Sequence, residues 1–210
     1  MALGRVDGLE AVTVDAYGTL VELDEPVRRL QEALRRRGIE REDETVARAF
    51  GAEVAYYKEH KLEGRDSESV AELCARCARV FTDAAACELD FADDFGAALV
   101  FVPLPGVREA LEQLRAAGLR LAVVSNWDVG LAGHLDRLGL GSSFEAVVTS
   151  AEVGAEKPDP AIFRLALERL GLPAARVLHV GDDEADELGA RAAGLRFAPA
   201  PLADAVAGLA

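Results

Sequence analysis

The chain has 210 residues, half of them hydrophobic, and a formal net charge of −14. This length suffices for one compact domain, or one domain with a modest insertion, that buries a core. The negative charge argues against binding to nucleic acids or to anionic membranes, because both need clustered Lys and Arg.

The N-terminal residues MALGRVDGLEAV contain no apolar run long enough for a signal peptide, and no later stretch approaches a membrane span. The three cysteines are an odd number in a chain without secretory features. Cys74 and Cys77 lie in a helical pattern, where their spacing predicts two small buried residues on one face rather than a metal or redox site. We therefore expect a cytoplasmic protein with reduced thiols.

The first predicted strand, Glu10–Val14, runs directly into an acidic residue. Asp15 follows the strand, and Tyr17, Gly18 and Thr19 form the next loop. A carboxylate delivered to the end of a buried strand marks a candidate functional site.

Residues 23–100 have a different composition, rich in Arg, Glu and Ala. Helical periodicity is clear in VRRLQEALRRR and ETVARAFGAEVAYYKEH, and no strand of comparable quality appears. We interpret this segment as a helical cap domain inserted over one end of a sheet, and we expect it to determine substrate specificity.

From residue 101 onward, amphipathic helices alternate with short apolar strands. The predicted helices are Val107–Ala117, Leu131–Leu138, Ile162–Leu170 and Ala185–Ala193. The predicted strands are Leu119–Ser125, Phe144–Ser150, Ala175–Asp182 and Leu195–Pro199. This alternation predicts an α/β core domain, residues 1–22 and 101–210, with a doubly wound, Rossmann-like parallel sheet.

In an open parallel sheet, ligands bind beyond the carboxyl ends of the strands. The polar residues expected at this edge are Asp15, Tyr17, Thr19, Ser125, Asn126, Lys157, Asp182, Asp183 and Asp186. Two carboxylates about 4 Å apart repel by roughly 4 kcal/mol at an effective dielectric constant near 20. Several acids facing one lysine must therefore protonate or hold a cation, and carboxylate oxygens suit Mg²⁺. His179, inside the fourth strand of this set, is expected to be a packed core residue.

These motifs resemble those of the haloacid dehalogenase-like hydrolase superfamily. The family pattern is D-x-x-x-[TV] after the first strand, Ser or Thr after the second, a lone Lys, and G-D-x-x-x-D after the fourth. The matching positions, in the same order, are Asp15–Thr19, Ser125, Lys157 and Gly181–Asp186. The resemblance covers Glu10–Leu20 and Pro103–Phe197, and residues 23–100 match no family motif.

The resemblance implies a Mg²⁺-dependent, phosphatase-like hydrolase of the metal-type branch, acting on a small phosphorylated metabolite. Asp15 would attack phosphorus and form an aspartyl-phosphate. The residues expected to position or protonate the reacting group are Tyr17, Thr19, Ser125, Asn126 and Lys157. The expected Mg²⁺ ligands are Asp15, the Tyr17 carbonyl and Asp182, supported by Asp183 or Asp186. The partner is the small-molecule substrate alone, with neither nucleic acid nor membrane, and the protein is expected to be a monomer or homodimer.

Tyr17 departs from the phosphatase pattern, which has a second aspartate at this position as general acid and base. A phenol can donate a proton to a leaving group but is a poor base at neutral pH. The string DAYGTL resembles the haloacid dehalogenases proper, so a metal-independent 2-haloacid dehalogenase that uses an Asp15 ester is one alternative. The acids at Asp182 and Asp183, where those enzymes have no metal site, favour the metal-dependent reaction. A catalytically degenerate module that binds a phosphate ligand or a protein partner is the second alternative.

Overall fold

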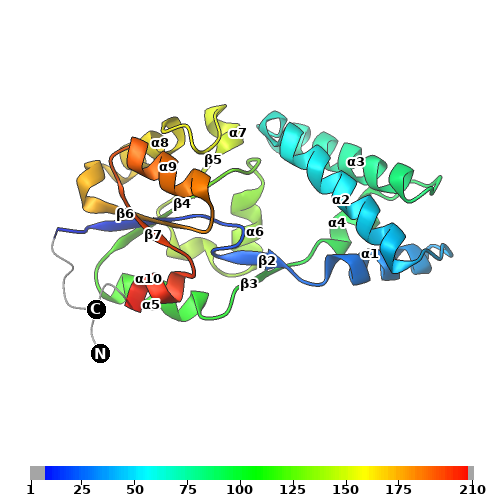
Figure 1. Ribbon diagram of the computed structural model, residues 1–210, viewed down its shortest axis with the longest axis horizontal. Helices are drawn as coiled ribbons and strands as arrows, with labels where there is room; N and C mark the ends of the chain where they lie inside the picture. The colour runs from blue at the N-terminus through cyan, green and yellow to red at the C-terminus, as the bar shows by residue number, and fades with distance from the viewer. Residues whose placement is uncertain (1–7, 208–210) are drawn as a thin grey trace. The chain divides into compact units, whose positions relative to one another are not determined.

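The computed structural model describes residues 8–207, which form two compact units (Figure 1). One unit combines the two ends of the chain, residues up to 22 and from 103 onward, and the other comprises residues 23–102. Both boundaries fall in short paired strands, β2 (Val21–Leu23) and β3 (Phe101–Pro103). The predicted helical insertion, residues 23–100, lies within the second unit.

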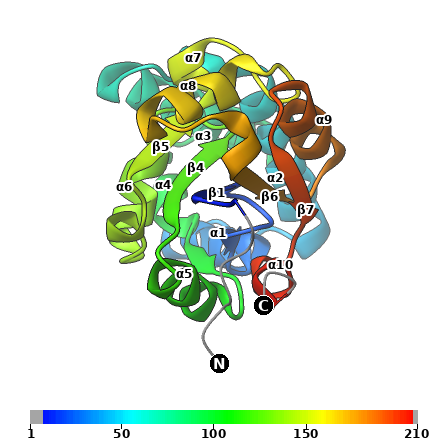
Figure 2. The ribbon, with the colours of Figure 1, turned by 90° about the vertical axis from the view of Figure 1, so that its left-hand side faces the viewer.

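The first unit is built on a five-stranded sheet with the order β5-β4-β1-β6-β7, in which every pairing is parallel (Figure 2). Its strands are β1 (Ala11–Val14), β4 (Arg120–Ser125), β5 (Ala146–Thr149), β6 (Val177–Gly181) and β7 (Arg196–Pro199). The predicted Rossmann-like α/β fold is confirmed. The predicted strands agree with these bounds to within two residues at each end.

The central strands β1, β4 and β6 are almost entirely buried, which explains their near-continuous apolar sequences. The chain continues from β1 to one side of the sheet through β4 and β5, and then returns to the other side through β6 and β7. The strand order therefore reverses at β1, and the carboxyl end of β1 is the topological switch point where ligands bind in such sheets.

Helices cover both faces of this sheet. They are α5 (Val107–Ala116), α6 (Leu131–Arg137), α7 (Ser150–Val153), α8 (Ala161–Leu170), α9 (Glu184–Ala192) and α10 (Leu202–Ala207). In Figures 1 and 2, α8 and α9 lie on one face and α5 and α10 on the other. The four helices predicted here agree with α5, α6, α8 and α9 to within one residue at each end.

The second unit is helical, apart from its short terminal strand segments. Its helices are α1 (Pro26–Arg36), α2 (Asp43–His60), α3 (Ser67–Ala84) and α4 (Ala92–Ala98). They pack around their own apolar core, which includes Leu34, Leu73 and Phe81. The C-x-x-C pair lies in α3 as expected, but only Cys77 is buried, because Cys74 falls at the exposed edge of the helix. Among residues 8–207, no helix is long and apolar enough to cross a membrane.

Candidate active site

Three neighbouring strands end in polar residues at the carboxyl edge of the sheet. Asp15 follows β1, Ser125 ends β4, and Asp182 follows β6. Parallel pairing of β1 with both β4 and β6 brings these strand ends to one edge, and the Asp15 N–H donates to the Val180 carbonyl at 2.9 Å. All of these residues belong to the first unit, so the site lies within one compact body.

The loop after Asp15 turns at Gly18, which has a φ of +80°. A Cβ atom at this position would lie 2.3 Å from Oδ2 of Asp182, so only glycine allows the loop to approach this carboxylate so closely. The Thr19 hydroxyl donates to Oδ1 of Asp182 at 3.3 Å. Gly18 thus allows the first predicted motif, Asp15–Thr19, to lie against the fourth, Gly181–Asp186.

Lys157 lies between two carboxylates and is almost completely buried. Its ammonium donates to Oδ1 of Asp15 at 2.6 Å and to Oδ1 of Asp186 at 2.5 Å. Burial alone would lower the pKa of Lys157, but the two carboxylates outweigh burial and raise it. Lys157 is therefore a fixed positive charge beside Asp15.

Asn126 holds the backbone of Lys157 on both sides. Its Oδ1 accepts the Lys157 N–H at 2.7 Å, and its Nδ2 donates to the Lys157 carbonyl at 3.2 Å. Both polar atoms of the Asn126 amide are used in this way. Asn126, one of the predicted catalytic residues, thus holds the backbone of Lys157 in place.

Asp186 is the most heavily hydrogen-bonded acid of the site. Its Oδ1 accepts from Lys157 and lies 2.9 Å from Nε2 of His179, and its Oδ2 accepts the Asp183 N–H at 3.3 Å. Burial alone would raise the pKa of Asp186, but the hydrogen bond with His179 and the Lys157 charge lower it to about 2. Burial also lowers the pKa of His179, which keeps this imidazole neutral.

Asp182 carries the uncompensated charge of the site. Asp15, Asp182 and Asp186 each place one carboxylate oxygen within 4.8 Å of the others. Burial, followed by repulsion from Asp15 and Asp186, raises the pKa of Asp182 to about 6. Three carboxylates face one ammonium, and this donor set fits a small divalent cation that prefers oxygen ligands.

The other predicted residues differ in their exposure and in their contacts. Asp183 is exposed, and its carboxylate caps α9 by accepting the Asp186 N–H at 3.0 Å. The Tyr17 side chain is 51% exposed. Ser125 is buried at the end of β4, opposite Thr149 of β5. The structure therefore brings Asp15, Lys157, Asp182 and Asp186 together and places Asp183 at the helix start.

His179 and Thr13 were not predicted as site residues. His179 is fully buried, as expected of a core residue, but its ring also contacts Asp186 and the Thr13 hydroxyl. The signal for this contact was present in the sequence, because each is the polar residue of an otherwise apolar buried strand. A buried polar group needs a partner, and these two are opposite each other in the β1–β6 register.

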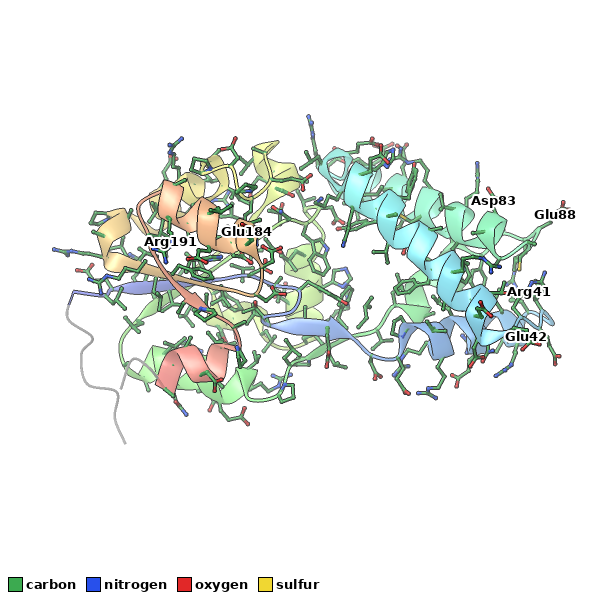
Figure 3. The ribbon with its side chains drawn as sticks, in the orientation of Figure 1. Arg41, Glu42, Asp83, Glu88, Glu184 and Arg191 are labelled. Atoms are coloured by element: carbon green, nitrogen blue, oxygen red, sulfur yellow. The ribbon has the colours of Figure 1, made fainter. Side chains whose placement is uncertain are left out.

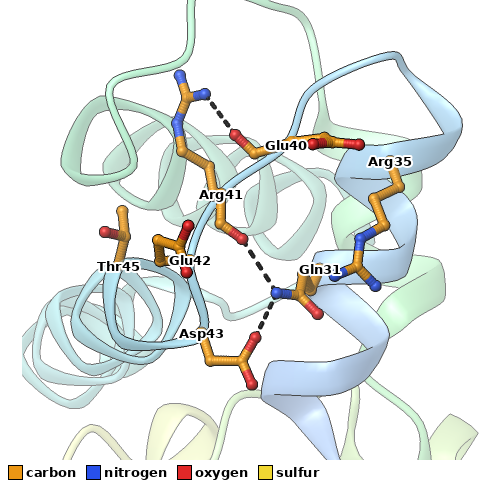
Figure 4. Close-up of a pocket in the computed structure, with 7 residues that line it drawn as sticks. All are labelled: Gln31, Arg35, Glu40, Arg41, Glu42, Asp43 and Thr45. Carbon is orange, nitrogen blue, oxygen red and sulfur yellow. Dashed lines mark hydrogen bonds between the residues drawn. The ribbon is translucent and has the colours of Figure 1, made fainter.

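A pocket of about 380 Å³ lies in the second unit and contains none of the predicted site residues (Figure 4). Its lining residues are Gln31, Arg35, Glu40, Arg41, Glu42, Asp43 and Thr45. Gln31 donates to the Arg41 carbonyl at 3.0 Å and to the Asp43 carboxylate, and Arg41 donates to the Glu40 carbonyl. These contacts hold α1 against the start of α2, and we assign no chemistry to them.

The family model described as haloacid dehalogenase-like hydrolase matches residues 9–194. The chain belongs to this family. Haloacid dehalogenase-like hydrolase domain-containing protein 3 of Mus musculus is 43% identical over 104 residues, which cover 49% of this chain and 41% of that protein. Ribulose-1,5-bisphosphate 5-phosphatase of Halopiger xanaduensis is 40% identical over 107 residues, 49% of this chain and 45% of that protein. The chain therefore spans less than half the length of these two relatives.

A solved structure of the family aligns over more of the chain. The L-2-haloacid dehalogenase of Xanthobacter autotrophicus has a TM-score of 0.66 and 27% identity, covering 91% of this chain and 77% of that one. The resemblance to the haloacid dehalogenase-like superfamily, stated from four motifs, is thus confirmed by the family model and by this fold.

Proposed function

We propose that this hydrolase is a Mg²⁺-dependent phosphatase that acts on a small phosphorylated metabolite, with Asp15 as the nucleophile. The observation that carries the proposal is the carboxylate cluster at the switch point of the sheet, in which Asp15 and Asp186 are buried on either side of Lys157 and Asp182 is exposed. A relative 40% identical over about half of this chain is named as a sugar-bisphosphate phosphatase, which supports the same substrate class.

In the proposed reaction the two oxygens of Asp15 have different tasks. Oδ1 accepts the hydrogen bond from Lys157, and Oδ2 would attack phosphorus. The new Oδ2–P bond forms as the bond from phosphorus to the leaving oxygen breaks, which gives an aspartyl-phosphate. Water then attacks phosphorus, releases inorganic phosphate and restores the Asp15 carboxylate.

Lys157, Ser125 and Thr19 would bind the phosphoryl oxygens during transfer. The Lys157 ammonium lies next to the nucleophile, where it would stabilise negative charge that develops on the transferred group. Ser125 ends β4, the strand next to β1, and Thr19 lies in the loop that follows β1 and Asp15. Asn126 would keep Lys157 in this position.

The Mg²⁺ ligands would be Asp15, the Tyr17 carbonyl and Asp182. The bound ion would neutralise the charges that otherwise keep a carboxylate away from a phosphate. Asp186, rather than Asp183, would support the ion, because Asp186 belongs to the cluster and the Asp183 carboxylate caps α9.

Tyr17 sets a limit on this chemistry. The phenol would donate a proton to the leaving oxygen but would activate water poorly. We therefore propose slow turnover and a preference for acyl and aryl phosphates, whose leaving groups need little protonation.

A second candidate is the metal-independent dehalogenation of short 2-halo acids through an Asp15 ester. Its support is the similarity in fold to the L-2-haloacid dehalogenase, together with the DAYGTL string. The charge on Asp182 speaks against it, because that reaction has no use for a third carboxylate at the nucleophile.

Hydrolysis of p-nitrophenyl phosphate and acetyl phosphate, with Mg²⁺ and with EDTA, tests the proposal. We expect activity only with Mg²⁺, and its loss in Asp15→Asn. Mg²⁺ should also raise the melting temperature of the parent protein but not that of Asp182→Asn, since binding to the folded state stabilises it. Halide release from 2-chloropropionate in EDTA would establish the dehalogenase instead. A co-purified ligand that stays unmodified, with no hydrolysis of any substrate, would favour the binding module.

A further inference from the structure

A chain of hydrogen-bonded side chains runs from Thr13 on β1 to Asp15, which follows this strand. The Thr13 hydroxyl lies 2.9 Å from Nδ1 of His179, and Nε2 of His179 lies 2.9 Å from Oδ1 of Asp186. Asp186 then accepts from Lys157, which donates to Asp15. Thr13 lies on β1, and Asp15 directly follows the last residue of that strand. All five side chains are buried.

The chemistry of the partners fixes the tautomer of His179. An ionised carboxylate can only accept, so Nε2 must carry the proton that it donates to Asp186. In a neutral imidazole, Nδ1 is then an acceptor, and the Thr13 hydroxyl is the donor it meets. Asp186 therefore sets the tautomer, and the Thr13 hydroxyl satisfies the remaining ring nitrogen.

The His179 ring is held in place from two sides. Thr13 and His179 are register partners in the β1–β6 pairing. The ring of Phe163, from α8, packs edge-on against the imidazole with centroids 4.8 Å apart. Asp186 lies on α9, so the His179–Asp186 bond fixes a helix-borne carboxylate to the centre of the sheet.

We propose that His179 is a positioning residue of the active site: it orients Asp186, which in turn places the Lys157 ammonium against Asp15, while the Thr13 hydroxyl satisfies the other ring nitrogen of His179. Partners that orient a functional group from behind are commonly worth 10- to 100-fold in metal affinity or activity. The kinetic part of this inference rests on the proposed phosphatase reaction, whereas its structural part does not.

The tautomer is read first, without substrate, from ¹⁵N spectra of the imidazoles. The chain has three histidines, so the signals of His179 are identified by their loss in His179→Gln. We expect a neutral ring protonated at Nε2 both in the parent protein and in Thr13→Val, because Asp186 accepts from Nε2 in both. A ring protonated at Nδ1 in either protein would overturn the proposal.

The Lys157 ammonium provides a second readout that needs no substrate. Its ¹⁵Nζ–H signal should be protected from exchange in the parent, exposed to exchange in His179→Leu and protected again in His179→Gln, whose amide donates from near the Nε2 position. If His179→Leu fails to fold, His179→Met, which also lacks the donor, carries the same test. Unchanged protection in a folded variant without the donor contradicts the proposal, whether or not the protein hydrolyses phosphates.

Kinetics then separate positioning from general stability. At saturating Mg²⁺, His179→Leu should lower kcat by about 10- to 100-fold with KM within about threefold, and His179→Gln should recover most of the loss. His134→Gln is the matched control and should leave both parameters unchanged. A loss in His179→Leu that only follows the folded fraction of the protein, or no loss at all, would overturn the proposal.

Discussion

Two buried carboxylic acids, Asp186 in the first unit and Glu53 in the second, have opposite pKa shifts. Asp186 in the first unit accepts from Lys157 and lies against His179, and its pKa falls to about 2. Glu53 on α2 of the second unit is nearly as buried, but its hydrogen-bond partner is the Cys77 thiol, and burial raises its pKa to about 7. Depth of burial is similar, so the partner decides whether the acid is charged at neutral pH.

This difference in pKa distinguishes the candidate active site of the first unit from the helical core of the second. In the first unit, buried charges are kept ionised by one another, at the edge of the sheet where ligands bind. In the second unit, burial favours the protonated form of Glu53, whose hydrogen-bond partner Cys77 lies on α3. The following predictions alter one side of this comparison at a time.

The largest effect is expected from Lys157→Met. The substitution leaves Asp15 and Asp186 buried without their cation, and it removes the positive charge beside the transferred group. We expect kcat to fall by about 10²- to 10³-fold, the loss typical for a group that stabilises a developing charge. Lys58→Met, at an exposed lysine of the second unit, is the control and should keep full activity. Steady-state kinetics of both variants at matched folded fraction decide the point, and equal kcat values would refute it.

Glu53→Gln tests the second unit through the pH dependence of stability. The folded-state pKa of Glu53 is raised, so the stability it contributes is present below pH 4.5 and is lost as the pH rises through about 7. Between pH 5 and pH 9 the parent should therefore lose on the order of 2–3 kcal/mol relative to Glu53→Gln. Urea denaturation of both proteins across this pH range measures the difference in their free energies of unfolding. Exposed Glu59 on the same helix supplies the control variant Glu59→Gln; parallel curves for parent and Glu53→Gln would contradict the account.

Tyr17→Asp should extend the chemistry of the first unit to poorer leaving groups. An aspartate could act as both general acid and general base, so hydrolysis of alkyl phosphates should rise by roughly tenfold or more, while acyl phosphates change little. Tyr17→Phe, which lacks the proton donor, serves as the comparison. A Tyr17→Asp variant that is no faster on alkyl phosphates would show that Tyr17 does not limit the reaction.

The smallest effect is expected for Arg191→Ala. Arg191, labelled in Figure 3, lies on α9. It pairs with Glu187 one turn earlier, and both side chains are largely exposed. Such a pair is worth about 0.5 kcal/mol or less and weakens with salt. Thermal denaturation should show little change, and kcat should be unaltered. A loss comparable to that of Lys157→Met would mean that exposed pairs matter as much as buried ones here.

The sequence predicted the fold well because its patterns are local. Apolar runs between helices specify a parallel sheet, and glycines after the helices mark their ends. The same reasoning placed Asp15, Lys157 and Asp182 at one edge, because strand ends of a parallel sheet meet there. It could not separate Asp183 from Asp186, since both follow β6 closely, and only the helix geometry turns one carboxylate to the cap and the other into the site.

For the hydrogen-bonded chain through His179, the sequence shows that Thr13 and His179 each need a polar partner but not which partner each one has. Thr13 and His179 are 166 positions apart, and their contact depends on which strands are neighbours and in what register. The contacts of Asn126 could not be predicted either, because its position after β4 is compatible with a phosphate contact or with the observed hydrogen bonds to the Lys157 backbone. Strand order, not local pattern, decides these contacts.

Trapping of the covalent intermediate tests the central claim most directly. The protein is mixed with acetyl phosphate and Mg²⁺, quenched with borohydride and digested, and the peptide that contains Asp15 is measured by mass spectrometry. Borohydride reduces an acyl phosphate to an alcohol, so the account predicts homoserine at position 15, and none in EDTA. Hydrolysis that proceeds with an unmodified Asp15, or with the modification at another acid, would contradict it.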